Sequence, residues 1–307
     1  MRSLSILCYH GVVDSIPNGF NSSGKHLNLR VFERQIDFLA RNFEIVTMKD
    51  VENFYQNRGD LPKQSVAVTF DDGYANNLKY AHEILEKKSM KATVYIATGY
   101  IGSDKLMWSD EIELLILSIN AAKFKVRLDH EITFDGSTIG SKLIALNQIK
   151  KYLKKSPPEK ISVVIRILSK YVEDYKKGII PDLHDFLNWN QVRQMKSSNT
   201  WDVGAHTVDH FSLGTLSPSA GITQIKNSID KISKELKSDE LPLFSFPEGQ
   251  SFDMPVYAVE YLRDLGFKTV PSAISGENFL SKLSNAKPMR LKRYLVGFEG
   301  LDFPWQF

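Results

Sequence analysis

The sequence predicts an α/β protein built on a parallel sheet or barrel. Apolar strand-like runs alternate with segments of helical spacing over residues 3–98, and the alternation resumes after Asn188. The run from Ser65 to Phe70 has almost no polar face, which is typical of a strand covered on both sides in a parallel sheet. Between these parts, residues 103–187 lose the alternation, so we expect an insertion folded onto the barrel.

The first third of the chain supplies four predicted strands. Short apolar runs predict strands at 3–8, 44–48, 65–70 and 91–97. Apolar residues at helical spacing predict helices near 32–39, 48–55 and 78–88.

The insertion has a mixed pattern. We expect Ser109 to cap a helix, and alternating apolar residues over 124–134 predict a β-hairpin around Asp129 and His130. Helices are expected at 143–153 and 161–172, and the insertion shapes either a substrate groove or a subunit contact. Four lysines near the end of the first of these helices are interpreted as a solvated helix face: Lys150, Lys151, Lys154 and Lys155.

The last third returns to strands and helices. Asn188 or Asn190 is expected to cap a short helix, and strands are predicted at 201–205, 243–246, 267–270 and 290–296. Helices are predicted at 222–236 and 254–265, the second stopped by Gly266.

Length and composition limit the kinds of protein that this chain can be. The 307 residues are enough for one large domain or two small ones, with 42% apolar and 24% charged residues and a net charge of +3. That charge is too small to indicate nucleic-acid binding. The single cysteine, Cys8, excludes an internal disulfide, and we expect it to fill the core. No signal peptide or membrane-spanning run is recognisable, so the cytoplasm is the expected location; the oligomeric state is left open.

Two adjacent carboxylates follow the apolar run 65–70. Asp71 and Asp72 lie where a parallel strand ends, and Gly73 lets the chain turn. In α/β folds, catalytic and ligand-binding residues are usually found at the carboxyl ends of such strands. A simple Asp-Asp-Gly turn is the alternative.

A second polar segment favours the chemical interpretation. His206 and His210 follow another predicted strand and are four residues apart, so we expect both imidazoles on one side of a helical turn, able to hold one ion. Two histidines and a carboxylate are a recurrent catalytic ligand set that leaves one position open.

The segments 69–73 and 206–210 together resemble the polysaccharide deacetylase family, the NodB-homology carbohydrate esterases (carbohydrate esterase family four). Residues 8–12 and 244–249 resemble two further family segments in the right order. The resemblance implies a distorted (β/α)7-type barrel and does not cover the insertion.

The residue types indicate a divalent cation held by His206, His210 and one of the two acids, and the resemblance implies that this acid is Asp72. Zinc suits imidazole ligands best, and cobalt, nickel or iron can use the same set. The resemblance implies that Asp71 is the general base, with the exchange of roles between Asp71 and Asp72 as the alternative.

Other roles depend on the resemblance. The acid that protonates the leaving amine is expected to be His10, because no histidine follows His210; a structural histidine is the alternative. The backbone amide of Glu248 is expected to bind the oxyanion. An arginine common before this segment is replaced by Ser245, and Arg290 or Arg293 could supply its charge.

The predicted function is removal of an N-acetyl or other N-acyl group from an amino sugar of a polysaccharide or glycan precursor. An amidohydrolase for non-sugar amides and a catalytically inactive glycan-binding protein are the alternatives. Three aromatic residues could stack on sugar rings or pack in the core: Trp189, Trp108 and Tyr74.

Overall fold

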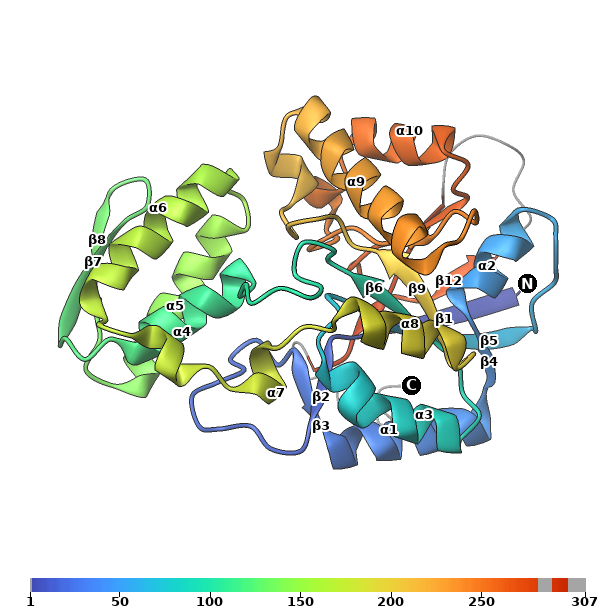
Figure 1. Cartoon of the computed structure of the whole chain (residues 1–307), viewed down its shortest axis with the longest axis horizontal. Helices are drawn as coiled ribbons and strands as arrows, with labels where there is room; N and C mark the ends of the chain where they lie inside the picture. The colour runs from blue at the N-terminus through green and yellow to red at the C-terminus, as the bar shows by residue number, and fades with distance from the viewer. Residues whose placement is uncertain (1, 281–288, 298–307) are drawn as a thin grey trace.

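A curled, mostly parallel sheet forms the centre of the computed structural model, which describes residues 2–280 and 289–297 (Figure 1). The strand order is β10-β9-β6-β5-β1-β12, with β14 also beside β1 and β4 beside β5. Among the described strands of this sheet, only β12 pairs antiparallel. These strands are β1 (Arg2–Tyr9), β4 (Glu44–Val46), β5 (Gln64–Phe70), β6 (Ala92–Ile96), β9 (Trp201–Ala205), β10 (Leu243–Phe244), β12 (Asn278–Leu280) and β14 (Tyr294–Leu295).

Both faces of the central strands are buried, as the sequence predicts. Along β5, Val66, Val68 and Phe70 join the large core under the outer helices. Ala67 faces the opposite way and joins a smaller core beneath α2 (Met48–Tyr55), together with Ile6 of β1. This two-residue alternation sends the side chains that follow β5 to defined faces of the sheet.

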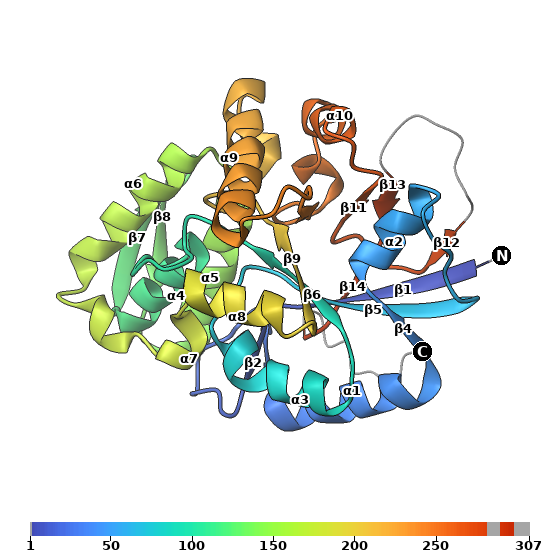
Figure 2. The ribbon, with the colours of Figure 1, turned by 45° about the vertical axis from the view of Figure 1, so that its right-hand side comes forward.

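Helices cover the outside of the sheet. Figure 2 shows α1 (Leu29–Asn42) and α3 (His82–Lys87) on one side and α9 (Pro218–Leu236) and α10 (Val256–Asp264) on the other. A π-helical turn at Asn77–Ala81 precedes α3, and α8 (Trp189–Ser197) begins at Asn188. Asn188 closes a reciprocal capping box with Gln191, which confirms the first of the two predicted caps.

Among the described residues the main sheet does not close into a complete barrel, because β11 (Thr269–Pro271) and β13 (Met289–Leu291), which come late in the chain, do not pair with it. β11 pairs in parallel with β13, and this pair is a sheet of its own. The predicted last strand, 290–296, is therefore two short strands, β13 and β14. A further parallel pair joins β2 (Gly11–Val13) to β3 (His26–Asn28).

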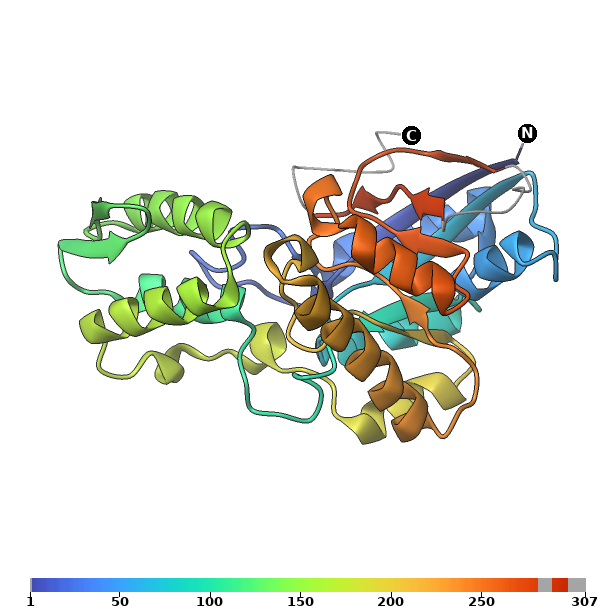
Figure 3. The same ribbon diagram turned by 90° about the horizontal axis from the view of Figure 1, so that it is seen from above.

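The segment between β6 and β9 forms a lobe beside the sheet (Figures 1 and 3). The predicted hairpin is confirmed, since the first of its two strands pairs antiparallel with the second. The prediction for Ser109 is wrong: the first helix begins one residue earlier, so Ser109 lies inside its first turn. The lobe contains α4 (Trp108–Ser118), β7 (Lys123–Arg127), β8 (Glu131–Asp135), α5 (Ile139–Leu153) and α6 (Pro158–Leu168), and the chain returns through short turns and α7 (Pro181–His184).

Buried ion pairs hold the lobe together and against the barrel. Lys150 of α5 pairs with Glu113 of α4 at 2.7 Å, and both side chains are buried. Lys25, before β3, pairs with Asp110 of α4, which also accepts a hydrogen bond from the Tyr74 hydroxyl at 2.7 Å. The prediction that Lys150 belongs to a solvated helix face is wrong, because its charge is neutralised inside the protein.

The fold brings the carboxyl ends of β1, β5, β6, β9 and β10 to one edge of the sheet, because these strands run in parallel. The residues next in the chain at three of these ends are His10, Asp71 and His206. No helix within the described ranges has the length and apolar character needed to cross a membrane.

Candidate active site

The turn after β5 places two acids at the same edge. Asp71 continues the strand, and its N–H donates to Tyr9 O of β1 at 2.9 Å. Asp72 then adopts a left-handed backbone with φ of 74°, followed by Gly73 with φ of 90°. A side chain at Gly73 would meet Ile96 at 2.9 Å, so only glycine fits this turn. Both carboxylates are buried, and both approach His206 Nε2, Asp71 Oδ2 at 3.8 Å and Asp72 Oδ1 at 3.7 Å.

Asp71 is held by a buried arginine. Arg293 donates from Nη1 to Oδ1 at 2.8 Å and from Nη2 to Oδ2 at 2.7 Å, a two-pronged ion pair with both groups almost fully buried. Its Nε donates to Ser272 O at 2.6 Å, which fixes the plane of the guanidinium. Arg290 does not take this place: its Nη2 donates to Met254 O at 3.2 Å.

The two predicted ligand histidines come from a loop. The helical turn expected at 206–210 is wrong, since these residues follow β9 without helix and Thr207 and His210 have positive φ of 63° and 55°. His210 N–H donates to the Thr207 hydroxyl at 3.2 Å. The turn still brings the two rings together, with centroids 4.9 Å apart.

Asp72, His206 and His210 form a cluster with the dimensions of a metal site. One ligand atom from each lies within 4.8 Å of the other two. His210 Nε2 lies 3.1 Å and His206 Nε2 3.7 Å from the same oxygen, Asp72 Oδ1. Despite this closeness, Asp72 Oδ1 makes no hydrogen bond of acceptable geometry with any described residue. A buried carboxylate oxygen facing two imidazole nitrogens fits a divalent cation.

The protein sets the tautomer of His206. Its Nδ1 donates to the carbonyl oxygen of Ser245 at 2.8 Å, so Nε2 carries the lone pair that faces Asp72. Burial lowers the pKa of His206 to about 4, which keeps the ring neutral at neutral pH. A neutral imidazole is the form that binds a metal ion.

Both carboxylates are ionised. Burial alone would raise the pKa of Asp71, but the charge of Arg293 and its hydrogen bonds lower that pKa to about 2. Burial is likewise outweighed at Asp72, where His210 is the largest influence lowering the pKa. Asp71 is therefore a carboxylate ready to accept a proton, and Asp72 a charged ligand.

His10 lies at the end of β1, beside Asp71 and Cys8. One polar atom from each of the three lies within 4.8 Å of the others. Burial lowers the pKa of His10, against the opposing influence of Asp72 and Asp71. A lowered pKa makes a protonated His10 a stronger proton donor, and its role as the acid remains a prediction.

The loop after β10 approaches the cluster from another side. Glu248 and Gly249 have left-handed backbones with φ of 59° and 61°, and Gly249 O accepts from Ala273 N at 2.8 Å. No described residue accepts a hydrogen bond from the Glu248 amide. The Glu248 carboxylate pairs with Lys154 at 2.7 Å.

The aromatic residues considered for sugar stacking divide in two groups. Tyr74 and Trp108 are buried, and Tyr74 stacks on Phe186 at 4.7 Å, so both pack in the core. Trp189 is half-buried, with Lys231 Nζ 5.4 Å from its ring centre.

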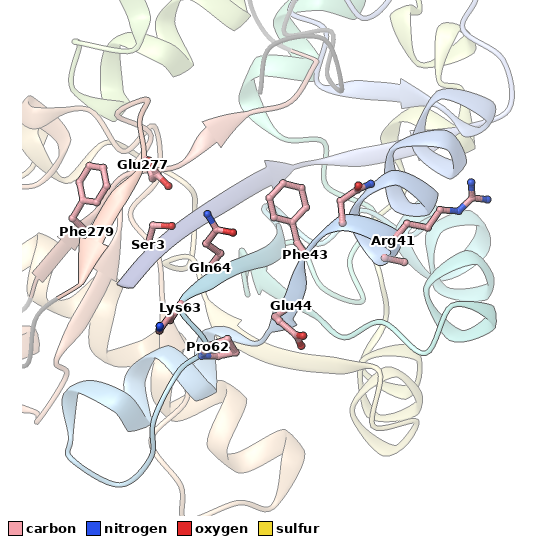
Figure 4. Close-up of a pocket in the computed structure, with 11 residues that line it drawn as sticks. Ser3, Arg41, Phe43, Glu44, Pro62, Lys63, Gln64, Glu277 and Phe279 are labelled. Carbon is pink, nitrogen blue, oxygen red and sulfur yellow. The ribbon is translucent and has the colours of Figure 1, made fainter. Parts of the chain in front are cut away.

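A separate hollow of about 920 Å³ lies at the opposite edge of the sheet (Figure 4). Ser3 and Gln64, near the starts of β1 and β5, line it together with Phe43 and Phe279. None of the residues that line it is a histidine or a cysteine. The buried histidine and aspartate groups lie at the other edge.

Sequence reasoning missed two contributions. The Ser245 carbonyl that orients His206 leaves no mark in the sequence, because any residue supplies a carbonyl. The lysine pattern predicts a solvated helix face for Lys154, and nothing local in the sequence indicates that it reaches Glu248, 94 positions away in the chain.

The fold and the cluster define an α/β protein with a buried His/Asp cluster at the carboxyl edge of its sheet. The family model described as polysaccharide deacetylase matches residues 58–118 and 130–270, well over half of the chain. The chain belongs to the polysaccharide deacetylase family, as its motifs predict.

Among curated proteins, the chain is similar to the putative polysaccharide deacetylase YxkH of Bacillus subtilis (strain 168), with 31% identity over 102 residues, 32% of this chain and 33% of that protein. It is also similar to poly-beta-1,6-N-acetyl-D-glucosamine N-deacetylase of Staphylococcus aureus (strain MSSA476), with 34% identity over 90 residues, 28% of this chain and 31% of that protein. The alignments thus span about a third of these relatives.

Solved structures share the fold along nearly the whole chain. The Streptococcus pyogenes deacetylase PplD in complex with acetate has a TM-score of 0.59 at 17% identity, covering 96% of this chain and 92% of that one. IcaB from Ammonifex degensii has a TM-score of 0.56 at 18% identity, with the same coverage. The α/β barrel predicted from the sequence is therefore confirmed.

Proposed function

We propose that this protein is a metal-dependent hydrolase that removes an N-acetyl group from an amino sugar of a polysaccharide or glycan precursor. The observation that carries the proposal is the buried group of Asp72, His206 and His210 beside an Asp71 fixed by Arg293. The family assignment supports amide hydrolysis on a sugar, and the activity named for the staphylococcal relative supports N-acetylglucosamine as the sugar class.

Asp72, His206 and His210 would hold the cation, most suitably Zn²⁺, with Co²⁺, Ni²⁺ or Fe²⁺ able to use the same ligands. When bound, the cation would act as a Lewis acid on the amide carbonyl and make a water molecule more acidic.

Asp71 is the proposed general base. Its ionised carboxylate can take a proton from the attacking water, and Arg293 keeps it ionised and correctly turned. The low pKa makes Asp71 a weak base towards ordinary water, so the reaction depends on a water whose acidity has been increased. The exchange of roles with Asp72 is less favourable, because Asp72 and not Asp71 lies nearest to His210.

Two groups complete the proposed reaction. The Glu248 amide would donate a hydrogen bond to the oxygen that gains negative charge, an interaction whose loss typically costs about 100-fold or more in rate. His10 would give a proton to the nitrogen of the leaving amino sugar. No histidine follows His210 in the chain, so His10 is the histidine best placed for this role.

The proposed substrate class includes nucleotide- or lipid-linked amino-sugar precursors as well as the polymer itself. Both substrate types belong in the test.

The test joins metal content to acetate release. Purified protein should carry about one divalent ion per chain, and a His206→Ala, His210→Ala double variant should carry almost none. Wild type should release acetate from β-1,6-linked N-acetylglucosamine oligomers or from nucleotide-linked N-acetylglucosamine, and Asp71→Asn should keep the metal but lose activity.

Other outcomes select the alternatives. Turnover of simple N-acetyl amides with no turnover of sugars would indicate an amidohydrolase for other substrates. Sugar binding without turnover, unchanged in Asp71→Asn, would indicate an inactive glycan-binding protein. Absence of a metal ion after incubation with zinc or cobalt would contradict the proposed chemistry.

A further inference from the structure

The lobe contributes a charged side chain to the loop that follows β10. Lys154 is the residue directly after α5, and its Nζ lies 2.7 Å from Glu248 Oε2. About 45% of the Lys154 side chain is exposed, against 16% for Glu248. Lys154 thus reaches from the lobe surface to a largely covered carboxylate.

The charges of the Lys154–Glu248 pair and of the cluster influence each other. Burial would lower the pKa of Lys154, but the charges of Glu248, Asp253 and Asp72 raise it. The Glu248 carboxylate is also among the charges that raise the pKa of His210 against the effect of burial. Ser245, three residues before Glu248 in the same loop, accepts the hydrogen bond from His206 Nδ1 at 2.8 Å, so the loop that carries Glu248 contacts a proposed metal ligand.

The last turn of α5 is anchored to α4 close to Lys154. Lys150, one helical turn earlier, is buried and paired with Glu113, whose other carboxylate oxygen accepts from Ser22 N at 3.2 Å. Residues four apart in a helix lie on the same side, so Lys154 leaves α5 on the side that Lys150 anchors to α4.

The Glu248 backbone needs such support. A non-glycine residue at φ of 59° lies in a sparsely populated conformation that persists only when its surroundings impose it. On one side, Ala273 fixes Gly249 O; on the other, the only ion pair of the Glu248 side chain found in the described ranges is with Lys154.

We propose that Lys154 is a positioning residue of the active site, supplied by the lobe, which holds Glu248 so that its backbone amide stays in place for the developing oxyanion. The lobe is thereby part of the catalytic apparatus and not only a cover for the barrel. This inference rests on the proposed deacetylation for its kinetic consequence, but the anchoring of the loop is independent of it.

The experiment compares Lys154→Met with Lys155→Met, the adjacent exposed lysine, which has no ion pair among the described residues. We expect Lys154→Met to lower kcat for acetate release about tenfold with KM changed less than twofold, and Lys154→Arg to restore most of kcat. A half-exposed ion pair contributes little to stability, so Tm should stay within about 1 °C of wild type.

Two further measurements sharpen the test. Amide hydrogen exchange of peptides from 244–252 should become severalfold faster in Lys154→Met and stay unchanged in Lys155→Met. In a Glu248→Gln background, Lys154→Met should have no further effect on kcat or exchange, because the pair is already broken.

The outcomes separate this inference from the proposed function. If wild type has no deacetylase activity, the proposed function fails, and hydrogen exchange still decides whether Lys154 holds the loop. If wild type is active but Lys154→Met matches Lys155→Met in both kcat and exchange, the inference is wrong and the function stands. A rise in KM alone would overturn positioning in favour of direct substrate binding.

Discussion

Arg293 compensates the negative charge of the buried Asp71 carboxylate. Because the pair is buried, removal of the guanidinium would leave an uncompensated negative charge. We expect Arg293→Met to lower the free energy of unfolding by about 3–5 kcal/mol, measured by urea titration.

A double variant controls this prediction. Asp71→Asn with Arg293→Met should be more stable than Arg293→Met alone, because neither charge is then left buried. Arg293→Lys should fall between wild type and Arg293→Met, since an ammonium cannot reproduce the two-pronged contact. A loss below about 1 kcal/mol in Arg293→Met would mean that Asp71 is solvated or protonated.

His26 should make the protein less stable in mild acid. It is buried, and burial, aided by the charge of Lys25, lowers the pKa of His26 to about 3. Below pH 6.5 the unfolded chain binds a proton at this ring and the native state does not, so stability falls as pH falls. For His26 alone the loss should reach about 2 kcal/mol at pH 5 relative to pH 7.5.

The measurement is the difference in free energy of unfolding between pH 7.5 and pH 5. His26→Gln should show a smaller difference than wild type, by about the amount assigned to His26. His130→Gln, which changes an exposed ring, should behave as wild type. Equal pH dependence in all three proteins would show that His26 takes up its proton in the native state.

At the scale of residues, the sequence predicts spatial contacts between groups that are close to each other in the chain. Asp71 with Asp72, and His206 with His210, are close because a single turn holds each pair. The partner of Asp71 is different: Arg293 is 222 positions away, and Arg290 has the same charge and similar surroundings in the sequence. Only the path of the chain after β13 decides between the two arginines.

At the scale of elements, spacing alone does not distinguish a helix from a compact loop. The rings of His206 and His210 come together as they would in a helical turn. The backbone achieves this without a helix, through positive φ values at Thr207 and His210. The order of the long central strands was predictable because β1, β5, β6 and β9 are buried along most of their length, whereas the short strand β12 was not predicted. The packing of the lobe was less predictable. In the sequence Lys150 cannot be distinguished from an exposed lysine, because its buried partner Glu113 belongs to another helix, α4.

The pairing of α4 with α5 leads to a prediction for the lobe. Lys150→Met should lower the free energy of unfolding by about 3–5 kcal/mol, because Glu113 would be left buried and unpaired. Lys155→Met should change it by less than about 0.5 kcal/mol, as expected for an exposed side chain. Urea titration of both variants gives the comparison.

A second substitution identifies the cause. Glu113→Leu combined with Lys150→Met should recover much of the lost stability, since apolar groups can replace a buried ion pair at little cost. If the double variant is no more stable than Lys150→Met, the loss comes from packing of the lysine stem and not from the charge.

At the scale of the whole molecule, the lobe and the barrel share one core. A continuous cluster of buried apolar side chains runs from Val68 and Phe70 of β5 to Phe124 of β7 and Leu146 of α5. The Tyr74–Asp110 hydrogen bond adds a polar link between the turn after β5 and the lobe. Proteins of this size often unfold in steps, whereas shared burial favours a single cooperative unit.

We therefore expect the lobe and the sheet to unfold together. In pulsed hydrogen exchange at increasing urea, peptides from 139–153 and from 64–70 should lose protection at the same concentration, because opening either part exposes the core of the other. Lys150→Met should shift both transitions equally to lower urea. Loss of protection in the lobe peptides alone would show a separately folding lobe, and the reach of Lys154 to Glu248 would then depend on a contact between two independent units.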